Sequence, residues 1–465
     1  MTTRLLVANS LRRRVALAVS SALALATTAT LTGCASFDPH NVLGRMAKPA
    51  DPPPAPLPAS TRAAALDAVW TTINERYYRA DLNGVDWRAA RERWQAKILG
   101  APTDDEFWKL LDKMTGELAD SHTRVESPSV VERQRLMRTP SLGLNLRLLD
   151  GRLAVMSVHP ESEAWWAGVR PGMTVAQIDG QDALTQWRGW AGDARKVSSP
   201  QAALRLPHRA LNELAVTRSY RKHATLPTLD GLAVSFERDD GTRIDTQLKA
   251  WGLSTAPSVS HRTLPSGIGY VRLTSFSEAL KAPLLAAITS LKDTPALILD
   301  LRGNGGGSGD MANALVGAFL KQKTALGDVV TRTAKPVTLG FGAYKMIELK
   351  REAPGRADAY AGKLAILIDH DSASASELTA AALQSVGRAT VVGEVSCGCL
   401  LGFLGYAALP GGGALAYSEI GFRTVKGDVI EGRGVLPDLA VTRSLSDLRL
   451  ARDRVLEQAQ AALLQ

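Results

Sequence analysis

Residues 364–387 read LAILIDHDSASASELTAAALQSVG. Residues 364–369 are mostly apolar with high strand propensity, whereas the residues from Glu377 to Gln384 favour helix and Gly387 is a typical helix end. The pattern predicts a strand, a serine-rich turn and a helix. At such a turn the first helical N–H groups have no intrahelical partner and the helix dipole is positive, which favours an anion forming beside a serine nucleophile. Capping of the helix by the same serines is the alternative.

The composition is that of a globular chain with roughly two or three domains. The chain has 465 residues, of which 45% are hydrophobic and 22% charged, and its formal net charge is +9. The basic excess is partly N-terminal, because residues 1–33 contain Arg4 and three arginines at 12–14 but no acidic residue. No basic cluster interleaved with aromatic residues stands out, so we predict no nucleic-acid partner.

The N-terminus has the features of an export signal. The arginines at 12–14 precede an apolar stretch at 15–26 that is too short to cross a bilayer comfortably. The ending Leu31-Thr32-Gly33-Cys34 resembles the bacterial lipobox, in which the cysteine is lipidated. We therefore predict a lipoprotein signal peptide at 1–33 and a lipid on Cys34, with a plain anchor helix as the alternative.

A lipobox implies a protein of the bacterial cell envelope that is lipid-anchored and faces the periplasm. Ala35 follows the cysteine, which favours the outer membrane. The Pro-rich stretch DPPPAPLPAS at 51–60 predicts that residues 34–60 form an extended tether.

Two units are expected next. Residues 61–138 have apolar positions three and four apart, which predicts a helical N-terminal domain. Residues 139–250 contain two strands around a turn at Asp150-Gly151, a helix that ends at Gly168 and a hairpin around Asp240-Gly241. This pattern resembles a PDZ domain, which implies peptide binding at the loop of Leu142, Gly143 and Leu144. A polar, helix-leaning insert at 184–228 interrupts the unit, and its function is not predicted.

Strand and helix alternate through residues 251–465, and a short mixed sheet near 409–423 is expected to complete this core. The loop RGNGGGSG at 302–309 lies between a predicted strand at 296–301 and a helix near 311–320. It lacks the Gly-Lys-Ser/Thr ending of a phosphate loop and the third glycine of a dinucleotide fingerprint. We therefore predict that its N–H groups stabilise an oxyanion, and we predict no cofactor and no metal.

Four motifs in order carry a resemblance to the carboxyl-terminal processing (tail-specific) serine peptidases: DLRGNGGG at 300–307, SASASE at 372–377, GRATVVGE at 387–394 and GRGVLPD at 432–438. The resemblance implies an α+β multidomain fold with a helical N-terminal domain, a PDZ domain and an α/β, crotonase-like peptidase core. It makes Ser374 the nucleophile. The N–H groups of Ala375 and of Gly305 or Gly306 would form the oxyanion hole.

The sequence departs from that family at its general base. Cys399 stands where the family has a lysine, and a thiol is a poor replacement because it is a weak base when un-ionised. Cys397 and Cys399 could form a disulfide, remain two thiols or supply half of a metal site. A second branch, resembling the tricorn protease core, uses a Ser-His pair and a late glutamate. On that model His122 is the base, and Ser121 and Glu431 orient the site.

These features predict a membrane-anchored serine endopeptidase that acts on unstructured or C-terminal polypeptide segments in the periplasm. A catalytically inactive peptide-binding scaffold is the alternative, because the lysine is absent. A redox-gated site is a third possibility, since Cys397 and Cys399 lie beside the predicted nucleophile. The sequence predicts neither an adaptor nor an oligomeric state.

Overall fold

The structure is a computed structural model that describes residues 56–133, 138–220, 230–254, 256–334, 338–341, 344–348, 351–402 and 406–465. The predicted signal peptide, Cys34 and most of the predicted tether lie outside these residues. Within the described ranges, no helix combines the length and the apolar character that a membrane span requires.

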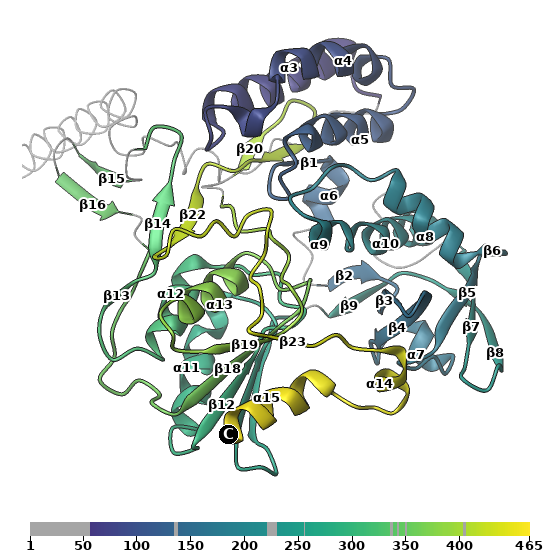
Figure 1. Cartoon of the computed structure of the whole chain (residues 1–465). Coiled ribbons are helices and arrows are strands. Elements are labelled where there is room, and N and C mark those ends of the chain that lie inside the picture. The colour runs from purple at the N-terminus through teal and green to yellow at the C-terminus, as the bar shows by residue number, and fades with distance from the viewer. Residues whose placement is uncertain are drawn as a thin grey trace, which may run out of the picture.

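The N-terminal unit is helical, as predicted (purple in Figure 1). Its helices are α3 (Ala59–Arg76), α4 (Trp87–Leu99), α5 (Asp104–Thr115) and α6 (Pro128–Arg133), with short 3-10 turns at Leu82–Gly84 and Gly116–Leu118. Local sequence explains where α5 begins. The Thr103 side chain accepts a hydrogen bond from the Glu106 N–H, and Asp104, Asp105 and Glu106 give the first turn a negative charge that favours the helix dipole. Phe107, Leu111 and Met114 then recur on one buried face.

Part of the segment expected to complete the core belongs to this helical unit instead. β20 (Tyr406–Ala408) and β21 (Ala414–Ala416) form a sheet with β1 (Arg124–Glu126), and Leu409, Leu415 and Tyr417 are buried in the helical core. The prediction for residues 409–423 was wrong for β21, because apolar alternation indicates strands but does not identify their pairing partner. It holds for β22 (Gly421–Thr424), which pairs with β14 (Gly327–Val330) and buries Phe422 in the core of the third unit.

The middle unit is an antiparallel sheet in the order β3-β4-β5-β7-β8, with β6 beside β5 (teal in Figure 1). Its strands are β3 (Leu144–Leu149), β4 (Arg152–Val158), β5 (Thr174–Ile178), β6 (Gln181–Asp182), β7 (Leu232–Glu237) and β8 (Arg243–Leu248), and β2 (Arg138–Ser141) pairs with β9 (Trp251–Ser254) nearby. Both predicted hairpins are confirmed. The helices are α7 (Glu163–Trp166), α8 (Ala183–Gly192), α9 (Pro200–Ala203) and α10 (Leu206–Ser219), of which the last three lie in or at the start of the predicted insert. The identity of this unit as a PDZ domain stays a prediction.

The third unit has the strand and helix alternation that was predicted. Its sheet has the order β10-β11-β12-β18-β19-β23, parallel except for the first pair. The strands are β10 (Val259–Thr263), β11 (Gly269–Leu273), β12 (Ala296–Asp300), β18 (Lys363–Ile368), β19 (Thr390–Gly393) and β23 (Leu439–Ala440). Short pairs at its margin join β13 (Thr324–Ala325) to β17 (Glu352–Ala353), β14 (Gly327–Val330) to β22 (Gly421–Thr424) and β15 (Thr338–Phe341) to β16 (Tyr344–Glu348).

Every residue of β12 is buried, which explains its continuous apolar run. Leu297 and Leu299 pack in the cluster that includes α11 (Lys281–Ser290), α12 (Gly309–Gly317) and α13 (Ala375–Ser385), whereas Ile298 packs in the cluster with α15 (Arg454–Leu464). Helices therefore cover both faces (Figure 1). A 3-10 turn at Glu278–Leu280 precedes α11, and α14 (Leu445–Arg449) packs against the middle unit through Leu445 and Leu448. The turn from β18 to α13 lies at the carboxyl ends of the parallel strands, where α/β sheets carry ligand sites.

Candidate active site

Ser374 occupies a strained position between β18 and α13. It is the N-cap residue of α13, with φ 55° and ψ −114°. Residues other than glycine rarely adopt this backbone conformation. Where they do, the surrounding structure holds them in place, and they cluster at functional sites. The sequence thus predicted the strand, turn and helix correctly, and the turn presents a serine at the start of a helix.

The glycine loop packs directly against this turn and is held by Asn304. The Asn304 carbonyl oxygen accepts hydrogen bonds from the Ala373 N–H at 3.0 Å and the Ser376 hydroxyl at 2.8 Å. Gly306 has φ +95°, and a Cβ there would lie 2.7 Å from Ser374 Cβ, so no larger residue fits.

The amides of this loop are not equivalent. The Gly306 N–H donates to Asn304 Oδ1 at 2.9 Å. The N–H groups of Gly305 and Ala375 have no acceptor in the part of the chain that the structure describes. Of the three predicted oxyanion donors, these two remain available, and the oxyanion role itself stays a prediction.

Glu377 fixes the geometry of the turn. It is fully buried, and its carboxylate accepts four hydrogen bonds at 2.6 to 3.0 Å, from Ser374 N–H, Ser396 Oγ, Gly398 N–H and Cys399 N–H. Burial raises the pKa of Glu377 to about 7, and these donors oppose the rise. One side chain therefore ties the nucleophile turn to the loop at 396–399.

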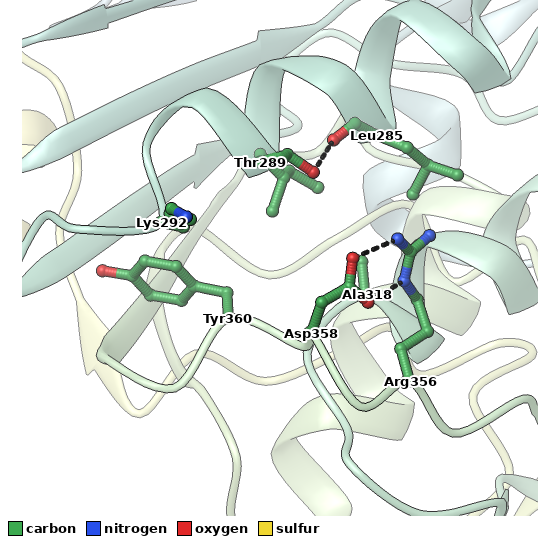
Figure 2. Close-up of a pocket in the computed structure, with 8 residues that line it drawn as sticks. Leu285, Thr289, Lys292, Ala318, Arg356, Asp358 and Tyr360 are labelled. Atoms are coloured by element: carbon green, nitrogen blue, oxygen red, sulfur yellow. Dashed lines mark hydrogen bonds and ion pairs between the residues drawn. The ribbon is translucent and has the colours of Figure 1, made fainter.

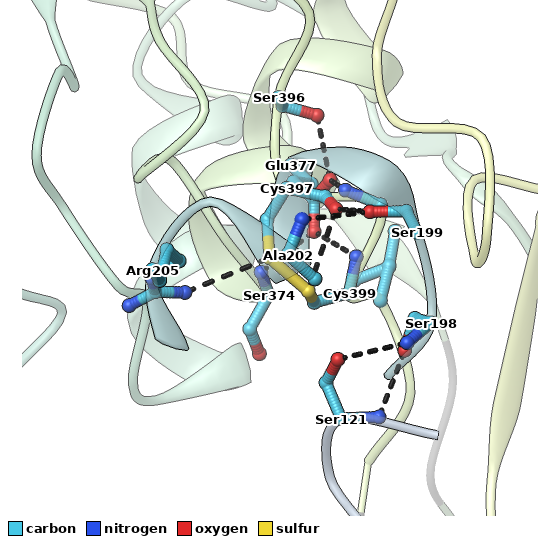
Figure 3. The surroundings of a disulfide bond; sticks show 12 residues. Ser121, Ser198, Ser199, Ala202, Arg205, Ser374, Glu377, Ser396, Cys397 and Cys399 are labelled. Carbon is cyan, nitrogen blue, oxygen red and sulfur yellow. Dashed lines mark hydrogen bonds between the residues drawn. A yellow bond between two sulfur atoms is a disulfide. The ribbon is translucent and has the colours of Figure 1, made fainter. Parts of the chain in front are cut away.

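Cys397 and Cys399 form a disulfide, so neither is a free thiol in this structure. The disulfide lies beside Ser374 in Figure 3, where both belong to one hydrogen-bonded group. The Cys399 carbonyl accepts from the Ser374 N–H at 3.1 Å, and the Cys397 N–H donates to the Ser372 carbonyl at 3.0 Å. The position that the resemblance assigns to the family lysine thus holds a disulfide with no proton-accepting group. No cluster of metal-binding side chains is found within the described residues.

Ser121 and Glu431 are brought to the same neighbourhood through Ser198. The Ser121 N–H donates to Ser198 Oγ at 2.8 Å, and the Ser198 N–H donates to Ser121 Oγ at 3.1 Å (Figure 3). The Ser198 side chain also interacts with Glu431 and lowers its pKa, but burial outweighs this effect and leaves the pKa of Glu431 well above its usual value. Glu431 Oε2 accepts from the Leu400 N–H at 2.7 Å, next to the disulfide loop.

His122 lies on the adjoining loop, but no hydrogen bond joins it to Ser374. Its Nδ1 is buried and has no partner among the described residues. Burial lowers the pKa of His122 to about 4, with a further lowering by Arg124 and Arg205 and an opposing effect of Asp120. The ring is therefore neutral at neutral pH. Its predicted role as base stays a prediction.

The predicted peptide loop is packed inside the protein. Leu142 and Leu144 are buried. The Leu142 N–H donates to Asn212 Oδ1 at 3.4 Å, the Gly143 N–H donates to Ser141 Oγ at 3.1 Å, and the Gly143 carbonyl accepts from the His159 N–H at 2.7 Å. These amides already have partners, so peptide binding there requires their exchange and stays a prediction.

The sequence analysis missed the contribution of the insert. Ser198, Ser199 and Arg205 all contact the site, and Ser199 caps α9 ahead of Pro200. The Ser-Ser-Pro sequence was a visible helix-start signal. This signal predicts the helix, but it does not predict that the helix packs against the disulfide loop beside Ser374.

Two hollows in the described part of the molecule differ in their relation to the predicted site. The one in Figure 2 has about 10 Å³, room for roughly one water, beside the Arg356–Asp358 ion pair, and no predicted site residue lines it. The other is a cleft of about 500 Å³ bounded by β3, α9 and the ends of β19 and β23. The Arg147–Glu394 ion pair and His370 line this cleft together with the exposed Leu204 and Leu436.

Comparison with known proteins agrees with this geometry. Residues 267–441 match the model of peptidase family S41, and residues 58–116 match the tricorn protease C1 domain. The carboxyl-terminal-processing protease of Picosynechococcus sp. is 25% identical over 404 residues, which cover 85% of this chain and 86% of that protein.

Two solved structures share the fold. The photosystem II D1 C-terminal processing protease has a TM-score of 0.54 and 21% identity, and the match covers 87% of this chain and 98% of that one. Mature CPAF complexed with lactacystin has a TM-score of 0.63 and 14% identity, with 88% and 98% covered. Residues 267–441 therefore match peptidase family S41, and the predicted resemblance to the carboxyl-terminal processing serine peptidases is confirmed.

Proposed function

We propose that this chain is a membrane-anchored serine endopeptidase that cleaves unstructured or C-terminal polypeptide segments in the periplasm. The observation that supports the proposal is the strained turn that holds Ser374 beside the available N–H groups of Gly305 and Ala375. Two such donors suit the oxyanion that forms when a serine attacks a peptide carbonyl.

His122 would take the proton from Ser374 and return it to the leaving amine. Its neutral ring and unpartnered Nδ1 suit a proton acceptor, and catalytic hydrogen bonds often close only when substrate binds. Ser121 and Glu431, linked through Ser198, would hold the His122 loop against the disulfide loop.

The cleft of about 500 Å³ supports a polypeptide substrate. Arg147 of β3 and Ala440 of β23 line it, and both strands are edge strands of their sheets, with which an extended chain can pair. Exposed leucines at 204 and 436 would contact its side chains.

Labelling with a fluorophosphonate, followed by peptide mapping, tests the activated serine. We expect label on Ser374 in the wild type, none in Ser374→Ala, and strongly reduced label in His122→Ala. Cleavage of an unfolded polypeptide should follow the same order. Undiminished turnover by Ser374→Ala would exclude this serine as the nucleophile.

An inactive peptide-binding scaffold is the second candidate, favoured by the disulfide at the lysine position and by the absence of a His122–Ser374 hydrogen bond. It predicts peptide binding without label or turnover. Attachment to the membrane is tested separately, by the loss of radiolabelled fatty acid and of membrane association in Cys34→Ala.

A further inference from the structure

The insert in the middle unit covers the loops around Ser374. Ser199 Oγ donates to the Cys397 carbonyl, and Ala202 packs against Ala373 and both cysteines. Figure 3 shows α9 and the residues before it passing over the disulfide and Ser374. A segment with no role predicted from sequence is therefore part of the wall of the candidate active site.

Arg205 contacts three loops of the site at once. Its Nε forms an ion pair with Asp371 Oδ1 at 3.1 Å, its Nη1 lies 3.5 Å from Cys397 Sγ, and its Nη2 lies 3.8 Å from where a Cβ of Gly305 would be. Sulfur is a weak acceptor, so the terminal N–H groups of this guanidinium retain donor capacity. They face the loop that carries a predicted oxyanion donor.

Three of the four arginines in this neighbourhood have a carboxylate partner. The ion pairs are Arg124–Glu126 at 2.7 Å, Arg195–Asp112 at 3.4 Å and Arg205–Asp371 at 3.1 Å. The fourth, Arg209 on α10, lies one helical turn after Arg205, to whose carbonyl its backbone N–H donates at 3.2 Å. Its guanidinium makes no ion pair and no hydrogen bond with any residue that the structure describes.

Arg209 is an exposed residue, yet desolvation by the surrounding protein lowers its pKa to about 10. Arg205 and Arg124 lower the pKa further, and the Asp112 carboxylate opposes this change. It remains charged at neutral pH. A guanidinium without an ion pair of its own, lying among other arginines, attracts an anion, and its planar fork matches a carboxylate.

We propose that Arg205 and Arg209 form a subsite that binds a carboxylate of the polypeptide substrate beside Ser374. This carboxylate is either the C-terminal α-carboxylate or an aspartate or glutamate side chain. The proposal rests on the proposed function for its substrate class, and it gives the insert a role in selecting substrates by charge.

Binding of fluorescent unstructured peptides to the mature Ser374→Ala chain tests this subsite without requiring turnover. One pair of peptides differs only in a free or amidated C-terminus, and a second set carries glutamate, glutamine or lysine at one internal position. We expect the carboxylate forms to bind about 10- to 100-fold more tightly, as for hydrogen bonds between charged partners. A preference within the first pair identifies the C-terminal carboxylate as the bound group, and a preference within the second set identifies an acidic side chain.

Arg209→Glu should abolish this preference and favour the lysine peptide. Arg188→Glu provides the matched control, because Arg188 is an exposed arginine on α8 and undergoes the same change of charge. Raising the salt concentration should reduce the preference in the parent protein.

Equal affinity for all peptides, no measurable binding, or a preference that survives Arg209→Glu would overturn the subsite. Wild-type labelling and turnover are measured in parallel and test the proposed function independently. A charge preference without labelling would refute the proposed peptidase activity and support the subsite. Cleavage without a charge preference would support the peptidase activity and refute the subsite.

Discussion

Glu377 and Glu431 are two buried carboxylates that both accept hydrogen bonds from the disulfide loop, and they differ in how many of their oxygens have hydrogen-bond partners. Glu377 accepts four hydrogen bonds that link the Ser374 turn to residues 396–399. Glu431 Oε2 accepts one from Leu400, but its Oε1 is buried without a hydrogen-bond partner in the described part of the chain. Burial raises the pKa of both.

A fully satisfied buried carboxylate is a structural element, because every partner would lose its acceptor if it were removed. A buried oxygen without a partner costs stability and is expected where function requires it. We therefore assign Glu377 to the scaffold and Glu431, with the similarly unpartnered His122 Nδ1, to the functional side of the site.

Glu377→Ala should have the largest effect. It leaves three buried donors without their acceptor and the Ser374 N–H with only the Cys399 carbonyl, so we expect a loss of roughly 3–5 kcal/mol in the free energy of unfolding, together with loss of Ser374 labelling. Urea denaturation measures the first effect. Glu457→Ala, which removes an exposed ion pair with Arg452, is the control and should change little. A loss as small as that of the control would show that the hydrogen bonds of Glu377 do not hold this loop.

The sequence predicts features that consecutive residues form, and it misses contacts between residues that lie far apart in the chain. The Ser374 turn was predicted because its strand, serines and helix are consecutive, and the glycine loop because it also lies between a strand and a helix. The pairing of β1 with β21 was missed because the two strands lie far apart in the sequence. A hydrogen bond beside them, from the Ser418 N–H to the Thr123 hydroxyl, joins residues 295 positions apart. Arg205 and Cys397, separated by 192 positions, were missed for the same reason. Local patterns determine elements, whereas folding determines which loops meet.

Replacing both cysteines with serine should have a smaller effect. The two residues are separated by only two positions, so the disulfide closes a very short loop and restricts the unfolded chain little. The loop-entropy model gives about 1–2 kcal/mol. Because Glu377 holds the loop independently, we expect labelling of Ser374 to persist in this variant and in the presence of reductant. Labelling that changes with reductant would instead support the redox-gated site.

The pH dependence of activity tests whether His122 works as the base. Its folded-state pKa is lowered from 6.5 to about 4, so the neutral ring persists as pH falls through the range in which an ordinary histidine protonates. Activity at pH 5.5 should thus be roughly tenfold higher than for a base with an ordinary pKa. An acid limb in kcat/KM near 6.5 would argue against this histidine.

The same shift has a consequence for stability. Because the folded-state pKa is lowered, the unfolded chain binds the proton more readily, so the contribution of His122 is present above about 6.5 and is lost as pH falls towards 4. His122→Gln should remove the part of the loss in unfolding free energy that His122 causes as pH falls from about 6.5 towards 4. An unchanged dependence of stability on pH in this variant would show that burial does not lower the pKa of His122.

Glu431→Gln should have the smallest effect on stability and is the sharpest test of the comparison. The glutamine carbonyl can still accept from the Leu400 N–H, and the amide removes a carboxyl whose ionisation is unfavourable in this buried position. We expect a change within about 1 kcal/mol at acidic pH. Since the folded-state pKa of Glu431 is raised, the wild type loses stability as pH rises above the ordinary glutamate value, and the variant should therefore gain relative to it.

Activity should respond differently from stability in Glu431→Gln. If the carboxyl orients the His122 loop through Ser198 and Ser121, turnover falls although the protein remains as stable as the wild type. Glu377→Gln is the matched comparison, because the same substitution there points an amide NH₂ at backbone donors and should cost stability at every pH. Equal destabilisation by the two glutamines would remove the distinction between a structural and a functional carboxyl, and with it the reason to place Glu431 in the catalytic group.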